Sequence, residues 1–115
     1  MADDLDEKGG FWLVLTTCPD AGSADRLAEM LVTRNLAACV NIQPQVRSIY
    51  RWQGKVESSA EHLLLIKTAA DRYDAVESLI KANHPYELPE VIAVSIVAGS
   101  RDYLGWIHQS VCESP

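Results

Sequence analysis

The sequence predicts a single α+β domain in which two βαβ units share one antiparallel sheet, the arrangement called ferredoxin-like. Three observations carry this prediction. The expected elements follow one another as β-α-β-β-α-β plus a terminal helix. The length of 115 residues suffices for one hydrophobic core and is short for two. Apolar residues make up 48% of the chain, a share that general disorder does not fit.

The first half of the fold begins with a buried central strand. Residues 11–15 form a continuous apolar run that leads into two threonines. Residues 18–22 are typical of a turn, after which Asp20 or Ser23 can cap a helix. This helix is expected to end at residues 34–35. Its apolar positions follow the helical spacing and are Ala24, Leu27, Met30 and Leu31.

A long hairpin forms the middle of the predicted fold. Apolar residues alternate with polar or small ones over residues 38–42 and again over residues 46–52. Pro44 lies between these stretches and indicates an edge strand or a bulge, so we expect a kink there. Residues 53–54 (Gln-Gly) indicate a tight turn, and the return strand runs over residues 55–68.

The hairpin is too long for a core of this size. Residues 38–53 would span roughly 50 Å at about 3.3 Å per residue, whereas ordinary strands have about 5–6 residues. The outer half is therefore expected to bend or overhang. An overhanging apolar ribbon with free edges favours pairing with other copies of itself in a closed homo-oligomer.

The second half repeats the pattern. Asp71 is expected to cap a helix that stops at residues 83–85, and residues 91–97 are predicted to form the last core strand. Residues 99–100 then open a short terminal helix. The inward residues are expected to be Tyr73, Val76, Leu79 and Ile80 in the second helix, and Tyr103, Leu104, Ile107 and Val111 in the terminal one.

This topology has a consequence for function. Right-handed crossovers place both helices on one face of the sheet. The end of the first strand (residues 16–18), His84 and the start of the last strand then meet at one pole.

Charge and composition narrow the function classes. The net charge of −6 disfavours nucleic acid as a partner, and no apolar run reaches the roughly 18 residues that span a membrane. Residues 1–10 are predicted to be a disordered acidic tail before a domain over residues 11–112. The tail has acidic residues where a signal peptide has basic ones, so a cytoplasmic protein is expected.

The three cysteines show no C-x-x-C pair, so neither a disulfide framework nor a structural zinc site is expected. Cys39 is interpreted as a small core residue, and Cys18 as the more accessible thiol. The sequence does not favour an enzyme. The chain has no P-loop and no nucleophile elbow, and it lacks the arginine that acylphosphatases of this architecture need in the first turn.

Several motifs occur together and in order. They are Leu-Ala-Ala-Cys-Val-Asn-Ile at 36–42, Ser48-x-Tyr50-x-Trp52-x-Gly54-Lys55, Lys67-Thr68, His84-Pro85-Tyr86-Glu87-x-Pro89-Glu90 and Tyr103-Leu104-x-Trp106. With them, the chain from Trp12 to Trp106 resembles the CutA divalent-cation-tolerance family. The resemblance implies a ferredoxin-like fold similar to that of PII signalling proteins. It also implies a stable homotrimer built by strand pairing, and a role in tolerance of copper and other divalent metals.

The resemblance also implies candidate metal ligands. Copper ligation in a bacterial relative is assigned to a cysteine and two adjacent histidines, which match Thr16, Asn83 and His84. His84 is thus retained, and Cys18 lies two residues beyond the cysteine position. We expect these two residues as ligands of Cu(II) or another divalent cation, since imidazole suits copper and thiolate suits Cu(I). The structural alternative is that His84 caps the second helix.

Further donors would have to come from Glu61, Glu87, Glu90 or a neighbouring subunit. The remaining signature residues are candidates for a ligand pocket or for intersubunit contacts: Tyr86, Glu87, Glu90, Tyr50, Trp52, Lys55 and Lys67. Residues of this kind also hold proline-flanked loops by hydrogen bonds, and aromatic residues on a ribbon also bury against a partner.

We therefore expect a non-enzymatic, cytoplasmic homotrimer that binds or responds to divalent metal, copper first, with no organic cofactor and no nucleic-acid or membrane partner. Two alternatives remain open. One is a PII-like sensor of a small metabolite, and the other is a structural trimeric interaction protein with incidental metal binding.

Overall fold

The computed structural model describes residues 10–112. The predicted acidic tail lies outside these residues except for Gly10, and the domain limits of 11 and 112 stay a prediction. The elements in order are β1 (Phe11–Cys18), α2 (Ala21–Thr33), β2 (Cys39–Trp52), β3 (Lys55–Ala69), the 3-10 helix η1 (Ala70–Arg72), α3 (Tyr73–Asn83), β4 (Ile92–Ile96) and α4 (Arg101–Val111).

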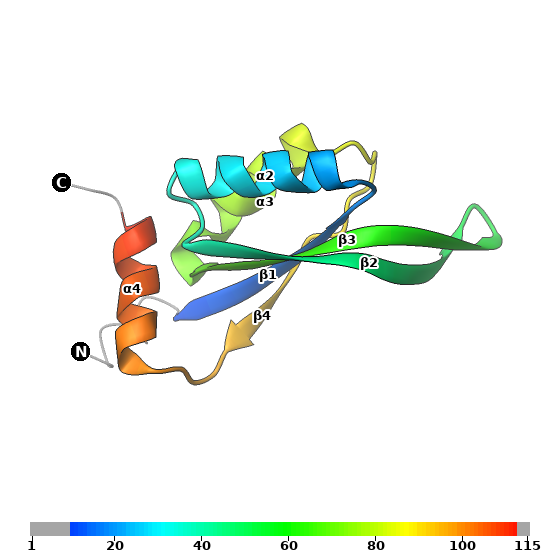
Figure 1. Cartoon of the computed structure of the whole chain (residues 1–115). Helices are drawn as coiled ribbons and strands as arrows, with labels where there is room; N and C mark the ends of the chain where they lie inside the picture. Colours follow the sequence, from blue (N-terminus) through cyan, green and yellow to red (C-terminus); the bar gives the residue numbers. More distant parts are fainter. Residues whose placement is uncertain (1–9, 113–115) are drawn as a thin grey trace.

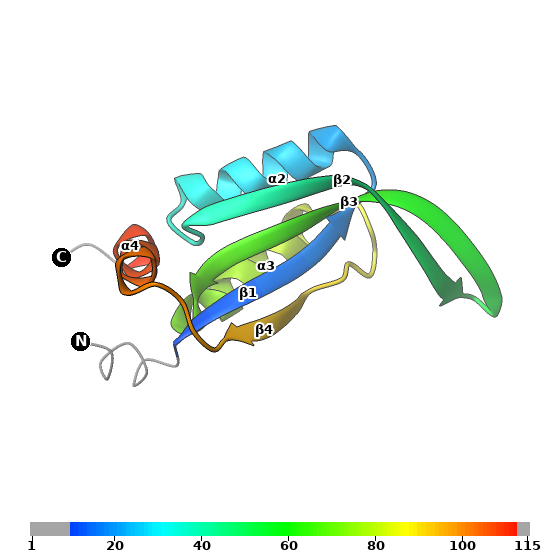
Figure 2. The same ribbon diagram turned by 60° about the horizontal axis from the view of Figure 1, so that its bottom comes forward.

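The predicted α+β fold is confirmed. The four strands form one sheet in the order β2-β3-β1-β4, and each neighbouring pair is antiparallel. Helices α2 and α3 lie side by side over the same face of this sheet (Figures 1 and 2). Asp20 caps helix α2, because its Oδ1 accepts a hydrogen bond of 2.7 Å from the Ser23 backbone N–H. Of the two predicted caps, Asp20 and Ser23, Asp20 is the one found.

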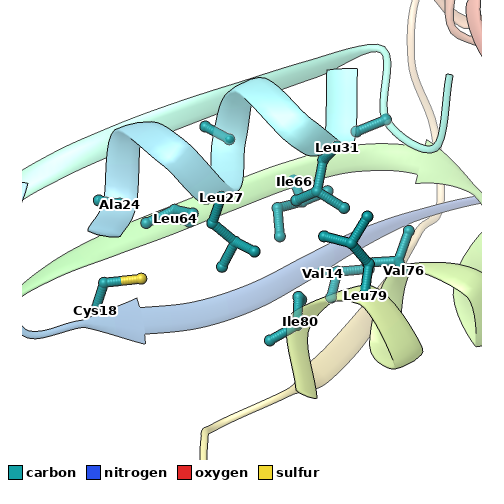
Figure 3. Close-up of a cluster of buried hydrophobic side chains, with 12 residues drawn as sticks. Val14, Cys18, Ala24, Leu27, Leu31, Leu64, Ile66, Val76, Leu79 and Ile80 are labelled. Atoms are coloured by element: carbon teal, nitrogen blue, oxygen red, sulfur yellow. The ribbon is translucent and has the colours of Figure 1, made fainter. Parts of the chain in front are cut away.

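The main core lies between the two helices and the sheet (Figure 3). Its side chains come from alternate positions of the inner strands and from one face of each helix, as the apolar spacing predicts. The largest fully buried members are Val14, Leu31, Leu64, Ile66, Val76 and Ile80. A second, smaller cluster joins Ile107 and Val111 of α4 to Phe11, Ala38 and Ala69 at the far end of β1 from Cys18.

The opposite face of the sheet is apolar as well. Side chains alternate between the two faces of a strand, so the neighbours of core residues, such as Leu13, Leu15 and Leu65, point away from α2 and α3. On β4, Ile92 is 51% exposed and Val94 is 48% exposed. Beyond the part near Phe11 that α4 covers, we call this surface the open face.

The predicted kink of the hairpin is confirmed. The pairing of β2 with β3 shifts register between Gln43 and Val46, and Gln45 at this bulge has a φ of 61°. The turn at residues 53–54 has positive φ values of 52° and 80°, as a two-residue hairpin turn of the primed type requires. We call residues 46–61 the ribbon. It projects beyond the helices (Figure 2), and the molecule measures 49 × 25 × 21 Å.

Three expectations on local structure need correction. Asp71 does not cap the second helix: it lies inside η1, and α3 follows directly at Tyr73, without a side-chain cap. The core strand predicted over residues 91–97 is shorter and less buried than expected: β4 is the edge of the sheet, Ala93 packs against the main core, and Ile92 and Val94 on the other face are about half exposed. Tyr103 of α4 is 41% exposed rather than inward.

Candidate functional site

The predicted pole exists, and its centre is the imidazole of His84. His84 follows the last residue of α3, where Pro85 forces the chain into an extended path. Its Nε2 lies 2.7 Å from the carbonyl oxygen of Thr17 and 3.9 Å from Sγ of Cys18. The structure thus brings the two predicted metal ligands, His84 and Cys18, into contact.

Both ring nitrogens of His84 are already used. A carbonyl oxygen only accepts hydrogen bonds, so Nε2 carries the hydrogen and donates it to Thr17. A backbone amide only donates, so Nδ1 is unprotonated and accepts the N–H of Tyr86 at 3.0 Å. The imidazole therefore ties the segment after α3 to the end of β1. This role is close to the structural alternative, although the ring bonds a strand and its own segment rather than the helix end.

The expectation that Cys18 is accessible was wrong. Strand β1 continues through Cys18, which pairs with His62, so its side chain falls on the same face as Val14 and is fully buried. Burial raises the pKa of the Cys18 thiol from 9.0 to about 11, with nearby Asp20 and Glu61 adding to the effect. The thiol is therefore protonated and weakly reactive at neutral pH.

A second contact fixes the segment from the other side. The hydroxyl of Tyr86 donates a hydrogen bond of 2.7 Å to Oε2 of Glu61 on β3. Burial and this carboxylate raise the pKa of the Tyr86 phenol well above its usual value. Glu61 itself is only 6% exposed. The segment is thus tied to two neighbouring strands, to β1 through His84 and to β3 through Tyr86.

Between the ribbon and this segment lies a cavity of about 930 Å³, which we call the ribbon groove. Its walls come from the end of β1, the ribbon and the residues that precede and start β4. The lining residues are Thr17, Ser48, Ile49, Tyr50, Arg51, Trp52, Glu61, Tyr86, Glu87, Leu88, Pro89, Glu90, Val91 and Ile92.

Most of the predicted pocket residues meet in this groove. Tyr50, Trp52, Tyr86, Glu87 and Glu90 all line it. The two lysines do not belong to that lining. Lys55 follows the hairpin turn opposite Trp52, and Lys67 lies at the other end of the open face. Its Nζ is 3.3 Å from the hydroxyl of Tyr103 and 5.4 Å from the centre of that ring.

Sequence reasoning missed two polar groove residues, Arg51 and Ser48, and treated Glu61 only as an additional metal donor. The register holds the signal that would have found Glu61. It pairs with Val46 across the bulge, which places it on the same ribbon face as Tyr50. Without the position of the bulge, that face could not be assigned, because a shift of one residue reverses it.

The metal-binding capacity of the pole is limited within one protomer. Cys18 and His84 are donors of the kinds that copper prefers. In the described range 10–112, however, no three His, Cys, Asp or Glu side chains gather closely enough to hold a metal ion. Among the same residues no helix is long and apolar enough to cross a membrane.

Known proteins resemble this chain along most of its length. Residues 12–110 match the family model described as CutA1 divalent ion tolerance protein. The chain is 46% identical over 102 residues to the rice protein CutA 1, described as chloroplastic, covering 89% of this chain and 58% of the relative. It is 45% identical over 98 residues to the divalent-cation tolerance protein CutA of Thermus thermophilus, covering 85% and 95%. This chain thus spans somewhat under three fifths of the rice relative's length, as it does for a mouse CutA, at 57%.

Solved structures agree. The crystal structure of CutA from Xylella fastidiosa superimposes with a TM-score of 0.87 at 45% identity, covering 89% of this chain and 98% of the other. The CutA of Archaeoglobus fulgidus, described as periplasmic, gives 0.86 at 35% identity, covering 88% and 98%.

Proposed function

Because this chain belongs to the CutA1 divalent ion tolerance family, we propose that it binds divalent cations, copper first, as a non-enzymatic homotrimer in the cytoplasm. The observation that carries the metal proposal is the contact between Cys18 and His84, 3.9 Å apart at the pole. Thiol and imidazole together are a donor pair that favours copper over magnesium or calcium.

The donor pair fits copper in kind, but it does not complete a coordination sphere. A metal at Nε2 of His84 must replace the hydrogen bond to Thr17, and the remaining donors must come from groove carboxylates or from another subunit. Cys18 would have to ionise, which its raised pKa disfavours until a metal takes the proton's place.

Calorimetry with Cu(II), Cu(I) and Zn(II) tests this proposal. We expect His84→Ala to weaken copper binding by about tenfold or more, because it removes one of two donors. Cys18→Ala should weaken Cu(I) binding by a similar factor while it keeps the hydrogen bonds of His84. His108→Ala, on α4 at the far end of the sheet, is the matched control and should bind like wild type. Equal copper affinity in wild type and His84→Ala would contradict the proposed metal site. It would favour the alternative of a structural interaction protein.

The trimer proposal rests on surfaces that one protomer leaves uncovered. Strand β1 ends opposite His62, so within residues 10–112 the ribbon strand Lys55–Glu61 pairs with β2 alone. Tyr50 and Trp52 on the ribbon are 41% and 43% exposed, and the open face adds Ile92 and Val94. Free strand edges beside apolar side chains favour strand pairing between subunits.

A second function, sensing of a small metabolite, is favoured by the ribbon groove. A cavity of about 930 Å³ is within the size range of small-molecule sites, which combine apolar walls with a few polar groups. Thermal-shift measurements against a panel of small metabolites would test it. A panel without any shift would count against this second function and leave the metal proposal untouched.

A further inference from the structure

The strongest unexplained feature of the ribbon groove is the carboxylate of Glu61. Glu61 is only 6% exposed. Among the described residues its hydrogen-bond partner is the hydroxyl of Tyr86, which donates to Oε2. An ionised carboxylate can accept about four hydrogen bonds, and burying one without a cation is costly. This side chain therefore leaves room for a positively charged donor on the groove side.

The walls around Glu61 suit an organic cation. Tyr86 bonds Glu61 directly, and the hydroxyl of Tyr50 lies 2.7 Å from Oγ of Ser59, two residues before Glu61, so both rings line the groove near the carboxylate. Aromatic faces attract ammonium and guanidinium groups. The hydroxyl of Tyr86 donates a hydrogen bond of 2.7 Å to Oε2 of Glu61, so it orients the carboxylate and leaves its other oxygen for a ligand. An aromatic wall and a buried carboxylate are the two elements that recognise an ammonium group.

The charge of the groove has the matching sign. Glu61, Glu87 and Glu90 line it together with a single basic residue, Arg51. The carboxylates do not converge as metal ligands do, because no group of three such donors occurs in the described residues. Negative charge spread over the walls of a partly apolar cavity fits an organic ligand better than a point ion.

We propose that the ribbon groove binds a small organic cation, whose ammonium or guanidinium group contacts Glu61 and lies against the rings of Tyr50 and Tyr86. This inference rests on the second proposed function, small-molecule sensing, and gives the chemical class of the ligand. It does not depend on the copper proposal, which uses Cys18 and His84.

Calorimetry on the intact protein with 1,4-diaminobutane tests the inference. The matched ligands are 1,4-butanediol, which has the same chain without charge, and succinate, which has the opposite charge. We expect the diamine to bind and the other two not to bind at millimolar concentration. Glu61→Gln should weaken diamine binding by about tenfold or more, because a charged hydrogen bond is lost while glutamine can still accept from Tyr86. Glu29→Gln removes the same charge from an exposed position on α2, on the other face of the sheet, and should bind within about twofold of wild type.

The outcomes distinguish this inference from the two proposed functions, metal binding and small-molecule sensing. Binding of butanediol or succinate in the groove would keep small-molecule sensing and overturn the cation class. Equal diamine affinity in wild type and Glu61→Gln would overturn the assignment to Glu61. Absence of any diamine binding, with copper still bound through His84, would overturn the inference and leave the metal function standing. Loss of Mn(II) binding in Glu61→Gln, without diamine binding in wild type, would identify a metal site instead.

Discussion

Two buried threonines show how much a single hydrogen bond decides at the scale of one residue. Thr16 on β1 and Thr68 on β3 are both fully buried. The hydroxyl of Thr68 donates to the carbonyl of Leu36 at 2.7 Å. In the described structure Oγ1 of Thr16 has no hydrogen-bond partner. The Thr68 hydroxyl thus has a hydrogen-bond partner, whereas the Thr16 hydroxyl has lost its hydrogen bonds to water without replacing them.

The two residues should respond oppositely to the same substitution. Thr16→Val removes the orphan hydroxyl, and we expect it to raise the free energy of unfolding by about 1 kcal/mol. Thr68→Val leaves the Leu36 carbonyl unpaired and should lower it by about 1–3 kcal/mol. Urea denaturation at one protein concentration measures both. A loss of stability in Thr16→Val would show that its hydroxyl is solvated or bonded in solution.

The sequence could place these residues but not their contacts. The continuous apolar run before Thr16 predicts a buried strand there, and this is confirmed. The exposure expected for Cys18 was wrong because the predicted turn over residues 18–22 begins after Cys18, at Pro19. The proline follows the last paired residue, so Cys18 still alternates onto the core face. A hydrogen-bond partner such as Thr17 for His84 depends on packing across 67 residues and has no local signal.

At the scale of an element, the segment between α3 and β4 is held by side chains rather than by sheet pairing. His84 bonds the Thr17 carbonyl and the Tyr86 amide, and Tyr86 bonds Glu61. The prolines at 85 and 89 restrict the backbone between these contacts. The segment is therefore a stiff wall of the ribbon groove whose position depends on one imidazole.

Removing that imidazole should loosen the segment. In His84→Ala we expect the Tyr86 amide to exchange its hydrogen about tenfold faster or more, since the loss of its acceptor is worth about 1–2 kcal/mol. Hydrogen exchange followed by NMR measures this amide directly, and His108→Ala serves as the control. Unchanged protection of Tyr86 would mean that the prolines and Glu61 hold the segment without His84.

Element positions were largely predictable, and their exposure was less so. The bulge near Pro44 and the two-residue turn follow from proline and glycine chemistry, which is local. The cap of α3 was wrong because η1 inserts an extra turn before the helix. The apolar residues of β4 predict a core strand, but an apolar run has the same appearance whether a helix or another subunit covers it.

At the scale of the whole molecule, the question is what covers the ribbon and the open face. We predict that Trp52→Glu shifts the protein from trimer to monomer at micromolar concentration, because it introduces a charge into an apolar contact between subunits. Light scattering measures the mass of the particle. The matched control is Val32→Glu on α2, where the side chain is 42% exposed on the helical face, and this variant should stay trimeric. A trimeric Trp52→Glu protein would exclude the ribbon from the assembly, and a monomeric wild type would exclude the trimer.

Because the ribbon projects from the protomer, ligand affinity in the groove should depend on protein concentration. One wall of the groove belongs to the body of the protomer, and the other belongs to a hairpin whose exposed side chains find little cover within the described chain. Association that covers this hairpin stabilises it by mass action, so dilution would loosen that wall before the body unfolds. Ligand affinity measured at nanomolar protein should then fall below the value at micromolar protein. The abundance of the protein in its compartment would thus set how sensitively it responds to its ligand.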